Sequence, residues 1–375
     1  MHYYISLTSK CNLSCKYCHG KSIDDFMDYE ESKKYDFNIP INSNVKINEL
    51  KNLSKNESDF KLTFYGGEPL LKIDMIKNIM DNVDAKEYMI QTNGQNLDKL
   101  PFKYTNKLST ILVSIDGTRE HTDERRGEGV YDKVVSNVKE IINNGYKGEI
   151  IARITVDETC DIYENVTYLY NNSDFSFSSI HWQIDAQFFG ADYKTRNFKE
   201  WLENDYMPNL KKLIHWWYNT IEEQKIVPRI YPFVGITYSL LTGEVSPMRC
   251  GAGHSCLGIQ TDGKIVSCPI TAGYKPLYMG DVRTSSFKEI VDNKIEPDGQ
   301  CLECSVKNLC GGRCLYANKT QLWGEKGYDE VCESVVFLIE SLREILPNIK
   351  KLINNGQLKI EDFDYPRYNG CEIIP

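Results

Sequence analysis

Three cysteines near the amino terminus are spaced closely enough to bind one metal group. Cys11, Cys15 and Cys18 follow one another as Cys-x3-Cys-x2-Cys. Three thiolates can hold three irons of a [4Fe–4S] cube and leave the fourth iron free to bind a small molecule. The alternative is a structural zinc site, but zinc usually needs four protein ligands, and only His19 stands nearby as a fourth.

A second group of cysteines gathers in the carboxyl-terminal third of the chain. Its members are Cys250, Cys256, Cys268, Cys301, Cys304, Cys310, Cys314 and Cys332. The chain has 13 cysteines, an odd number that cannot pair completely as disulfides. In a reducing compartment, clustered cysteines indicate metal ligands or catalytic thiols. Cys160 and Cys371 stand apart, and we interpret Cys160 as a small buried hydrophobic residue.

Composition predicts a globular protein and disfavours two classes of partner. The chain has 375 residues, 41% hydrophobic and 26% charged, which is the balance of a folded protein. It has 44 Lys and Arg against 53 Asp and Glu, so no basic excess indicates nucleic-acid binding. No apolar run reaches the length of about 18 residues that a membrane span needs, and the amino terminus lacks a secretory signal. We therefore expect a cytoplasmic protein with no nucleic-acid or membrane partner.

The residues between the two groups of cysteines alternate between strand-like and helix-like patterns. The expected strands are 2–8, 61–65, 87–91, 110–115, 149–156 and 180–189, and the expected helices are 70–83, 130–142, 162–170 and 199–224, the last broken near Pro208. Strand followed by helix, repeated about six times, predicts a parallel α/β sheet. In such sheets the active site lies at the carboxyl ends of the strands. The first cysteines and the segments 66–69, 92–94 and 114–117 all fall at these ends.

The chain beyond this body divides into three further parts. Residues 226–249 contain several Pro and Gly and are predicted to be a connector. Residues 250–335 are rich in Gly and Cys with little room for an apolar core, so metal clusters would have to stabilise them. The pattern of 334–346 predicts a helix that Pro347 should end or kink. The expected domains are therefore 1–225, the connector at 226–249, 250–335, and a terminal helix and tail at 336–375.

The first cysteine motif resembles the signature of the radical SAM superfamily. The three cysteines have its spacing, and Tyr17 is the aromatic residue before the last of them. Gly-Gly-Glu-Pro at 66–69 resembles the family's methionine-binding motif. The resemblance covers about residues 1–225 and implies a partial (β/α)6 barrel of the TIM type. It also implies that the open iron chelates S-adenosylmethionine, and that an electron from the cluster cleaves the sulfonium bond to give a 5′-deoxyadenosyl radical.

The same resemblance implies which residues hold the methionine end of the cofactor. Gly66, Gly67 and Glu68 would meet the ammonium group, with Glu68 as an acceptor and the glycines allowing close backbone approach. The same residues could form only a turn into a helix that begins at Pro69, and the two roles are compatible. Asn93, in Thr-Asn-Gly, matches a further family segment.

Other residues match the family's contacts to the rest of the cofactor. Ser114 and Asp116 match the strand that contacts the ribose. Arg126 would pair with the methionine carboxylate, or Arg125 if the alignment shifts by one residue. Phe188 could pack on the adenine, as could Tyr17, although aromatic residues at strand ends are more often part of the core.

The second group of cysteines resembles the SPASM domain, an extension of radical SAM enzymes that carries two auxiliary [4Fe–4S] clusters. The cysteines and Gly263 agree with it in order and spacing over about residues 250–335. The implied ligands are Cys250, Cys256, Cys268 and Cys314 for one cluster and Cys301, Cys304, Cys310 and Cys332 for the other. Four ligands leave no open iron, which favours electron transfer or a structural role. A pair of zinc ribbons is the alternative, because Cys-x2-Cys also suits zinc.

These resemblances imply a radical SAM oxidoreductase that modifies a peptide or protein. A hydrogen atom would be abstracted from a substrate residue to give a thioether or carbon–carbon cross-link or another oxidation, and the auxiliary clusters would accept or relay an electron. One alternative is an anaerobic sulfatase-maturing enzyme, which makes formylglycine in a protein substrate. In that family of enzymes an aspartate base directly follows the cysteine that matches Cys268. Pro269 occupies that place and cannot accept a proton. A non-enzymatic iron–sulfur or zinc protein is a further alternative, but it has no use for an open three-cysteine site.

The implied enzyme needs partners and an anaerobic cell. We expect a reducing partner such as flavodoxin or ferredoxin. Because the first ligand is Cys11, we expect no leader-binding domain ahead of it, and a separate protein could recognise the leader of the substrate. The sequence assigns no general base. The histidines considered are His19, His121, His181 and His215.

Overall fold

The computed structural model describes residues 1–19, 32–55, 57–172, 175, 177–188, 192–367 and 374, so Cys371 lies outside the described residues. The chain divides into two compact units. The first comprises 1–115, 119–151 and 251–296, and the second comprises 116–118, 152–250 and 297–375. The strands form one sheet in the order β6-β5-β4-β3-β2-β1-β7-β8-β9, and the first six in chain order are the parallel strands of a partial TIM-type barrel.

The strands of the first unit are short, apolar and buried. They are β1 (His2–Ser6), β2 (Lys61–Tyr65), β3 (Glu87–Thr92), β4 (Leu108–Ser114), the start of β5 (Glu149–Val156), β7 (Cys256–Ile259), β8 (Lys264–Val266) and β9 (Tyr278–Asp281). Strand β1 pairs in parallel with β2 on one side and with β7 on the other. Strands β7, β8 and β9 are antiparallel neighbours. The predicted strands of this unit are thus confirmed, with small shifts at their ends.

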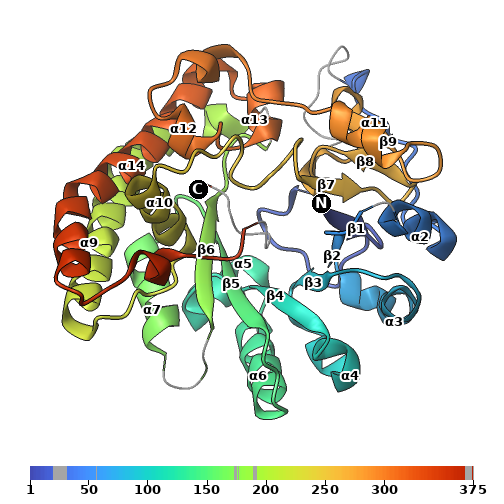
Figure 1. Cartoon of the computed structure of the whole chain (residues 1–375), viewed down its shortest axis with the longest axis horizontal. Helices are drawn as coiled ribbons and strands as arrows, with labels where there is room; N and C mark the ends of the chain where they lie inside the picture. The colour runs from blue at the N-terminus through green and yellow to red at the C-terminus, as the bar shows by residue number, and fades with distance from the viewer. Residues whose placement is uncertain are drawn as a thin grey trace. The chain divides into compact units, whose positions relative to one another are not determined.

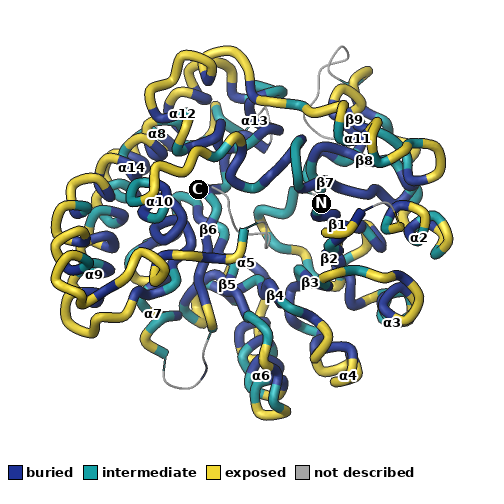
Figure 2. The backbone as a smooth tube through the Cα atoms, in the orientation of Figure 1, coloured by how far each residue is buried: buried dark blue, intermediate teal, exposed yellow. Residues whose placement is uncertain are grey.

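Helices and short 3-10 turns connect and follow these strands. They are α2 (Ile47–Lys55), the 3-10 turn η2 (Pro69–Lys72), α3 (Ile73–Asn82), η3 (Leu97–Lys99), α4 (Phe102–Thr105), α5 (Arg119–Arg126), α6 (Val130–Asn143), η6 (Pro269–Thr271), η7 (Lys275–Leu277) and α11 (Phe287–Asp292). Figure 1 shows α3, α4 and α6 beside strands β2 to β4. Their inward faces are buried and their outward faces exposed, as expected of amphipathic helices (Figure 2).

The second unit is mainly helical. It contains the end of β5, α7 (Ile162–Asn171), β6 (Ser179–Ile184), η4 (Asp192–Thr195), α8 (Phe198–Trp201), a π-helical turn η5 (Leu202–Tyr206), α9 (Met207–Gln224), α10 (Tyr231–Thr242), η8 (Gly299–Glu303), α12 (Lys307–Cys310), α13 (Leu315–Thr320), α14 (Gly324–Asn354) and η9 (Ile360–Phe363). The predicted helix does not break near Pro208: the backbone stays helical, and a π-helical turn precedes α9, in whose first turn Pro208 lies. Helix α14 packs along α9 and α10. No helix in the described ranges is both long enough and apolar enough to span a membrane.

Two further segments of this unit differ from the prediction. The connector contains helix α10, because Pro232 lies in its first turn and Gly243 caps its end in a left-handed conformation. Helix α14 does not end at Pro347 but continues to Asn354. Ile345 and Ile349 are buried on either side of this proline. Their burial offsets the hydrogen bond that proline removes.

Candidate functional site

The first three cysteines lie in the loop that follows β1. Cys11, Cys15 and Cys18 are partly exposed thiols. The backbone N–H of Leu13 donates to the Sγ of Cys11 at 3.4 Å. Free thiols that receive N–H donors are suited to bind iron as thiolates.

The glycine pair after β2 lies directly against this loop. Gly67 donates its N–H to the carbonyl of Thr8 at 2.7 Å, and Glu68 donates to the carbonyl of Lys10 at 2.9 Å. A Cβ on Gly66 would collide with the carbonyl oxygen of Thr8, and one on Gly67 would collide with that of Lys10. Gly66 also has a φ of 135°, which side chains disfavour. The glycines therefore allow two backbone segments to meet just before Cys11.

Glu68 is fully buried, and its carboxylate accepts three hydrogen bonds from the protein. Oε1 accepts from Leu70 N at 2.9 Å and from Thr92 Oγ1 at 2.8 Å, and Oε2 accepts from Asn93 N at 2.8 Å. Burial raises the pKa of Glu68, while these three donors act in the opposite direction. A carboxylate has about four acceptor sites. Glu68 thus ties the end of β2 to the end of β3 and keeps little capacity for the predicted ammonium contact.

Asn93 connects this carboxylate to the cysteine loop. Its side-chain Nδ2 donates to Asn12 Oδ1 at 2.9 Å and to the Sγ of Cys11 at 3.6 Å. Its Oδ1 accepts from Gln95 N at 3.0 Å, so the amide orientation is defined. The sequence analysis matched Asn93 to the family without this role and missed Asn12.

Two arginines of α5 lie over the aromatic residue of the cysteine motif. The guanidinium carbons of Arg125 and Arg126 are 4.5 and 5.3 Å from the centre of the Tyr17 ring. Both arginines are buried, and the carbonyl of Arg125 accepts from Lys16 N at 3.0 Å. Both candidates for the methionine carboxylate therefore lie at this loop, which leaves the choice between them open.

The remaining cofactor candidates occupy strand ends. Ser114 is the last residue of β4. In the second unit, Asp116 is fully buried, and its Oδ1 accepts from Thr155 N at 3.0 Å. Phe188 is buried beyond the end of β6. Cys160 is also buried, as predicted, and receives a hydrogen bond from Asn165 Nδ2 at 3.3 Å.

Four cysteines of the second unit lie in or directly after two short elements and in one long helix. Cys301 is in η8, Cys304 follows it, Cys310 ends α12 and Cys332 is in α14. Burial raises the pKa of the Cys310 thiol to about 11, with the thiols of Cys301 and Cys304 as further charges in its environment. Burial likewise raises the pKa of Cys332 to about 12. Because these thiols resist ionisation on their own, a metal cluster would have to supply the positive charge that stabilises them as thiolates.

Two polar side chains surround the sulfur of Cys301. The hydroxyl of Tyr328 lies 3.2 Å from Sγ, and Asn318 Nδ2 lies 3.5 Å from it. Asn318 Nδ2 also contacts the Tyr328 hydroxyl at 3.3 Å and donates to the carbonyl of Asp298 at 3.1 Å. The sequence analysis identified neither residue, because both are ordinary in type and distant from the cysteine in sequence.

The other four cysteines of the second group are divided between the units. Cys256 and Cys268 belong to the first unit, and Cys250 and Cys314 belong to the second. The His2 ring is buried between Thr63 and Cys256, with Nε2 at 2.6 Å from Thr63 Oγ1 and Nδ1 at 3.5 Å from Sγ. The pairing of β1 with β7 sets His2 opposite Cys256. No sequence signal indicated this contact.

Single-ion sites are not found in the described part of the chain. No three His, Cys, Asp or Glu side chains there gather closely enough to hold one ion. The ligands of a cube bind different irons, so they stand farther apart than those of one zinc ion.

Among the candidate histidines, His19 is half-buried, and loss of hydration lowers its pKa to about 4. His181 is buried on β6 and His215 is exposed on α9.

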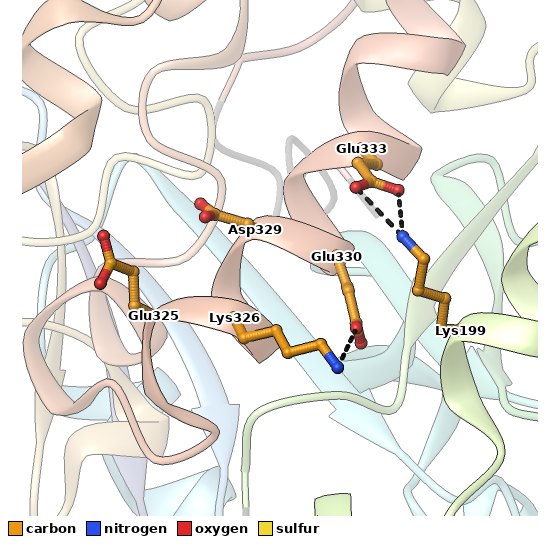
Figure 3. A pocket seen from close by; sticks show the side chains of 6 residues that line it. All are labelled: Lys199, Glu325, Lys326, Asp329, Glu330 and Glu333. Carbon is orange, nitrogen blue, oxygen red and sulfur yellow. Dashed lines mark hydrogen bonds and ion pairs between the residues drawn. The ribbon is translucent and has the colours of Figure 1, made fainter.

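A shallow surface pocket lies apart from the predicted residues, on α8 and the start of α14 (Figure 3). Lys199 pairs with Glu333 at 3.2 Å, and Lys326 pairs with Glu330 at 3.9 Å. Gln300 donates to Asp329 at 2.6 Å. Lys199 and Lys326 are thus paired with carboxylates of the pocket itself, and no observation indicates a ligand there.

Two family models match the chain. Residues 5–159 match the radical SAM superfamily, and residues 250–314 match an iron–sulfur cluster-binding domain called SPASM. The chain is similar to the radical SAM cyclopropyl synthase TigE of Paramaledivibacter caminithermalis, with 24% identity over 92% of this chain and 74% of the relative. It is also similar to a cysteine-type anaerobic sulfatase-maturating enzyme of Clostridium perfringens (strain 13), with 22% identity over 93% of this chain and 96% of the relative.

Solved structures show the same fold. The enzyme anSMEcpe with bound AdoMet and a Cp18Cys peptide matches with a TM-score of 0.70 and 19% identity over 94% of this chain and 99% of that one. SuiB of Streptococcus suis bound to its precursor peptide SuiA matches with a TM-score of 0.55 and 16% identity over 84% and 71% of the two chains. Peptides are thus bound in structures of similar proteins. The two family matches, the parallel barrel strands and the glycine pair set against the cysteine loop together identify this chain as a radical SAM enzyme with a SPASM domain.

Proposed function

We propose that this enzyme abstracts a hydrogen atom from one residue of a peptide or protein substrate and leaves it oxidised, as a thioether or carbon–carbon cross-link. The observation that carries the proposal is the complete cysteine set, three in the first loop and eight in the second group. The similarity to proteins whose names and structures concern peptide modification supports it. At this level of identity the similarity extends to the class of enzyme and leaves the bond formed to experiment.

The residues of the first loop fit a [4Fe–4S] cluster and S-adenosylmethionine. Three thiols are present, two donors contact the sulfur of Cys11, and the glycine pair brings a second backbone segment close. When bound, the cluster and cofactor supply the 5′-deoxyadenosyl radical that removes the substrate hydrogen. Glu68 fixes the turn that would present backbone groups to the methionine, and Arg125 or Arg126 offers a cation for its carboxylate.

The second group of cysteines would hold two auxiliary clusters. After the hydrogen atom has left, the substrate radical must lose one electron and a proton to close a cross-link. The eight cysteines of the second group would hold clusters that supply an acceptor for this electron, and flavodoxin or ferredoxin would be the external carrier. The product would therefore contain two hydrogens fewer than the substrate.

Formylglycine formation is the second candidate, because a sulfatase-maturating enzyme is among the similar proteins. Pro269 follows Cys268 and begins the turn η6, and its ring nitrogen has no proton to exchange and no free lone pair. A base from elsewhere in the chain would be needed. This departure makes the cross-linking activity the better supported of the two.

The test is anaerobic co-expression with the short peptide encoded beside this gene, followed by mass spectrometry of the peptide. Loss of two hydrogens, located by fragmentation, is expected with the wild type and absent with Cys11→Ala. A Cys301→Ser/Cys304→Ser variant that still folds should consume S-adenosylmethionine without forming the product. If the mass of the co-expressed peptide is unchanged and a sulfatase-motif peptide acquires formylglycine, the second candidate is correct and the proposal is wrong. A peptide whose mass is unchanged in ordinary water but which takes up deuterium in heavy water would indicate epimerisation.

A further inference from the structure

Arg313 occupies an unusual position between two expected cluster ligands. It precedes Cys314 and follows Cys310 by three residues. The backbone amides of Gly312 and Arg313 hydrogen-bond the Cys310 thiol. The Arg313 side chain is only 4% exposed. A guanidinium so deeply buried is costly unless negative charge lies nearby.

The protein supplies Arg313 with no carboxylate partner within the described ranges. Its Nη1 donates to the neutral Oε1 of Gln187 at 2.9 Å, and its Nε is buried without an acceptor. Gln187 in turn donates its Nε2 to the carbonyl of Gly327 at 3.3 Å, at the start of α14. The contacts of the described residues therefore leave the positive charge of Arg313 uncompensated.

Both partners of this hydrogen bond adopt strained backbone conformations. Gln187 has a φ of 67° and Arg313 has a φ of 54°, values that residues other than glycine rarely adopt. Such strain persists where the surroundings impose it and is concentrated at functional sites. Two strained residues that hold one buried cation indicate that the position of the charge matters.

A cluster held by the neighbouring cysteines would supply the negative charge that this cation lacks. The charge of Arg313 acts to lower the pKa of the Cys332 thiol in α14. A [4Fe–4S] cube with four thiolates is an anion, and its reduced form carries one more negative charge. A fixed cation beside it therefore stabilises the reduced form more than the oxidised form.

We propose that Arg313 compensates the charge of the auxiliary cluster held by Cys301, Cys304, Cys310 and Cys332 and raises its reduction potential. Gln187 is the positioning residue that holds the guanidinium in place. The inference rests on the proposed function, because it requires these four cysteines to hold a cluster. A raised potential suits a cluster that accepts an electron from substrate.

The experiment uses a background in which Cys11, Cys15 and Cys18 are replaced by alanine, so that only auxiliary clusters remain. In it, Arg313→Met removes the charge, Arg313→Lys keeps it, and Gln187→Leu removes the hydrogen bond. Arg343→Met is the matched control, since Arg343 is an exposed arginine on α14 that pairs with Glu340. Iron and sulfide are counted per chain, and the reduction potentials are measured by titration followed by electron paramagnetic resonance.

Arg313→Met should keep its iron and show a tenfold fall in the reduction constant of one cluster, about 59 mV to more negative potential. Arg313→Lys and Gln187→Leu should shift less, and Arg343→Met should match the background. Loss of iron in Arg313→Met but not in Arg313→Lys would also support charge compensation. Equal potentials in Arg313→Met and the background, or equal loss of iron in both Arg313 variants, would overturn it. A background protein without any iron would instead overturn the proposed auxiliary clusters themselves.

Discussion

Asn93 donates its side-chain amide to the Sγ of Cys11 across 3.6 Å, although 82 residues separate them in sequence. The same residue donates its backbone N–H to Glu68 at 2.8 Å. One residue at the end of β3 therefore contacts both the methionine-binding motif and an expected cluster ligand. Its side chain acts on the sulfur, and its backbone acts on the carboxylate.

Replacing Asn93 by Ala should make the potential of the cluster in the first loop more negative. Hydrogen bonds to sulfur stabilise the added charge of the reduced cluster. A threefold to tenfold change in the reduction constant corresponds to about 30–60 mV. The potential is measured in a variant that lacks all eight cysteines of the second group, so that only the cluster in the first loop remains. Gln95→Ala is the control, because Gln95 Nε2 donates to Val130 O at 3.2 Å and touches no sulfur. Identical potentials in Asn93→Ala and its parent would refute this role.

Replacing Tyr328 by Phe should shift the potential of an auxiliary cluster in the same direction. The Tyr328 hydroxyl lies 3.2 Å from the Sγ of Cys301, and phenylalanine keeps the ring but loses the donor. We expect a shift of about 30–60 mV with unchanged iron content. Tyr193→Phe is the control, since that hydroxyl bonds Glu330 at 2.9 Å. If both tyrosine variants behave alike, the Tyr328 hydroxyl does not act on the cluster.

The sequence predicted the strands and the cysteine groups because both depend on local order. Runs of strand-forming residues predicted the strands at 61–65 and 149–156 to the residue, and the spacing of the cysteines indicated two groups of metal ligands. Contacts between distant residues could not be predicted in this way. His2 meets Cys256 across 254 residues because β1 pairs with β7, and nothing local to either residue indicates that pairing.

The same limit applies to the roles of predicted residues. The motif alone led us to expect that Glu68 binds the cofactor. In the structure its carboxylate accepts three hydrogen bonds from other groups of the protein. Two of these donors, Thr92 and Asn93, come from the next strand of the sheet. A motif thus indicated which residues matter, whereas the sheet order determined what each side chain contacts.

Replacing Gly117 by Ala should disrupt the turn that carries Asp116. Gly117 has a φ of 112°, and a Cβ there would collide with the Asn165 side chain. Asn165 would then lose the hydrogen bond from Thr118 N to its Oδ1, now 3.1 Å long. We expect a loss of about 2–4 kcal/mol in the free energy of unfolding, from overpacking and backbone strain together.

A double-mutant cycle distinguishes this collision from backbone strain alone. Asn165→Gly removes the whole obstructing side chain, whereas Asn165→Ala keeps the Cβ, which also lies in the way. The cost of Gly117→Ala should therefore fall by at least about 1 kcal/mol in the Asn165→Gly background and change less in the Asn165→Ala background. The free energies come from urea unfolding of the apoprotein. Additive effects in both backgrounds would mean that strain alone sets the cost.

Replacing Glu68 by Gln should change how stability depends on pH. Burial raises the pKa of Glu68 above its ordinary value of 4.5, so the folded state binds this proton more tightly than the unfolded state does. The stabilisation is complete below the ordinary value and is lost as pH rises through the raised one. Glutamine does not titrate, so the advantage of the wild type over Glu68→Gln should shrink as the pH rises above 4.5. Urea unfolding of both apoproteins at each pH, with reductant present, measures this difference. If the advantage grows with pH instead, the donors at Leu70, Thr92 and Asn93 outweigh burial, and the folded state favours the carboxylate.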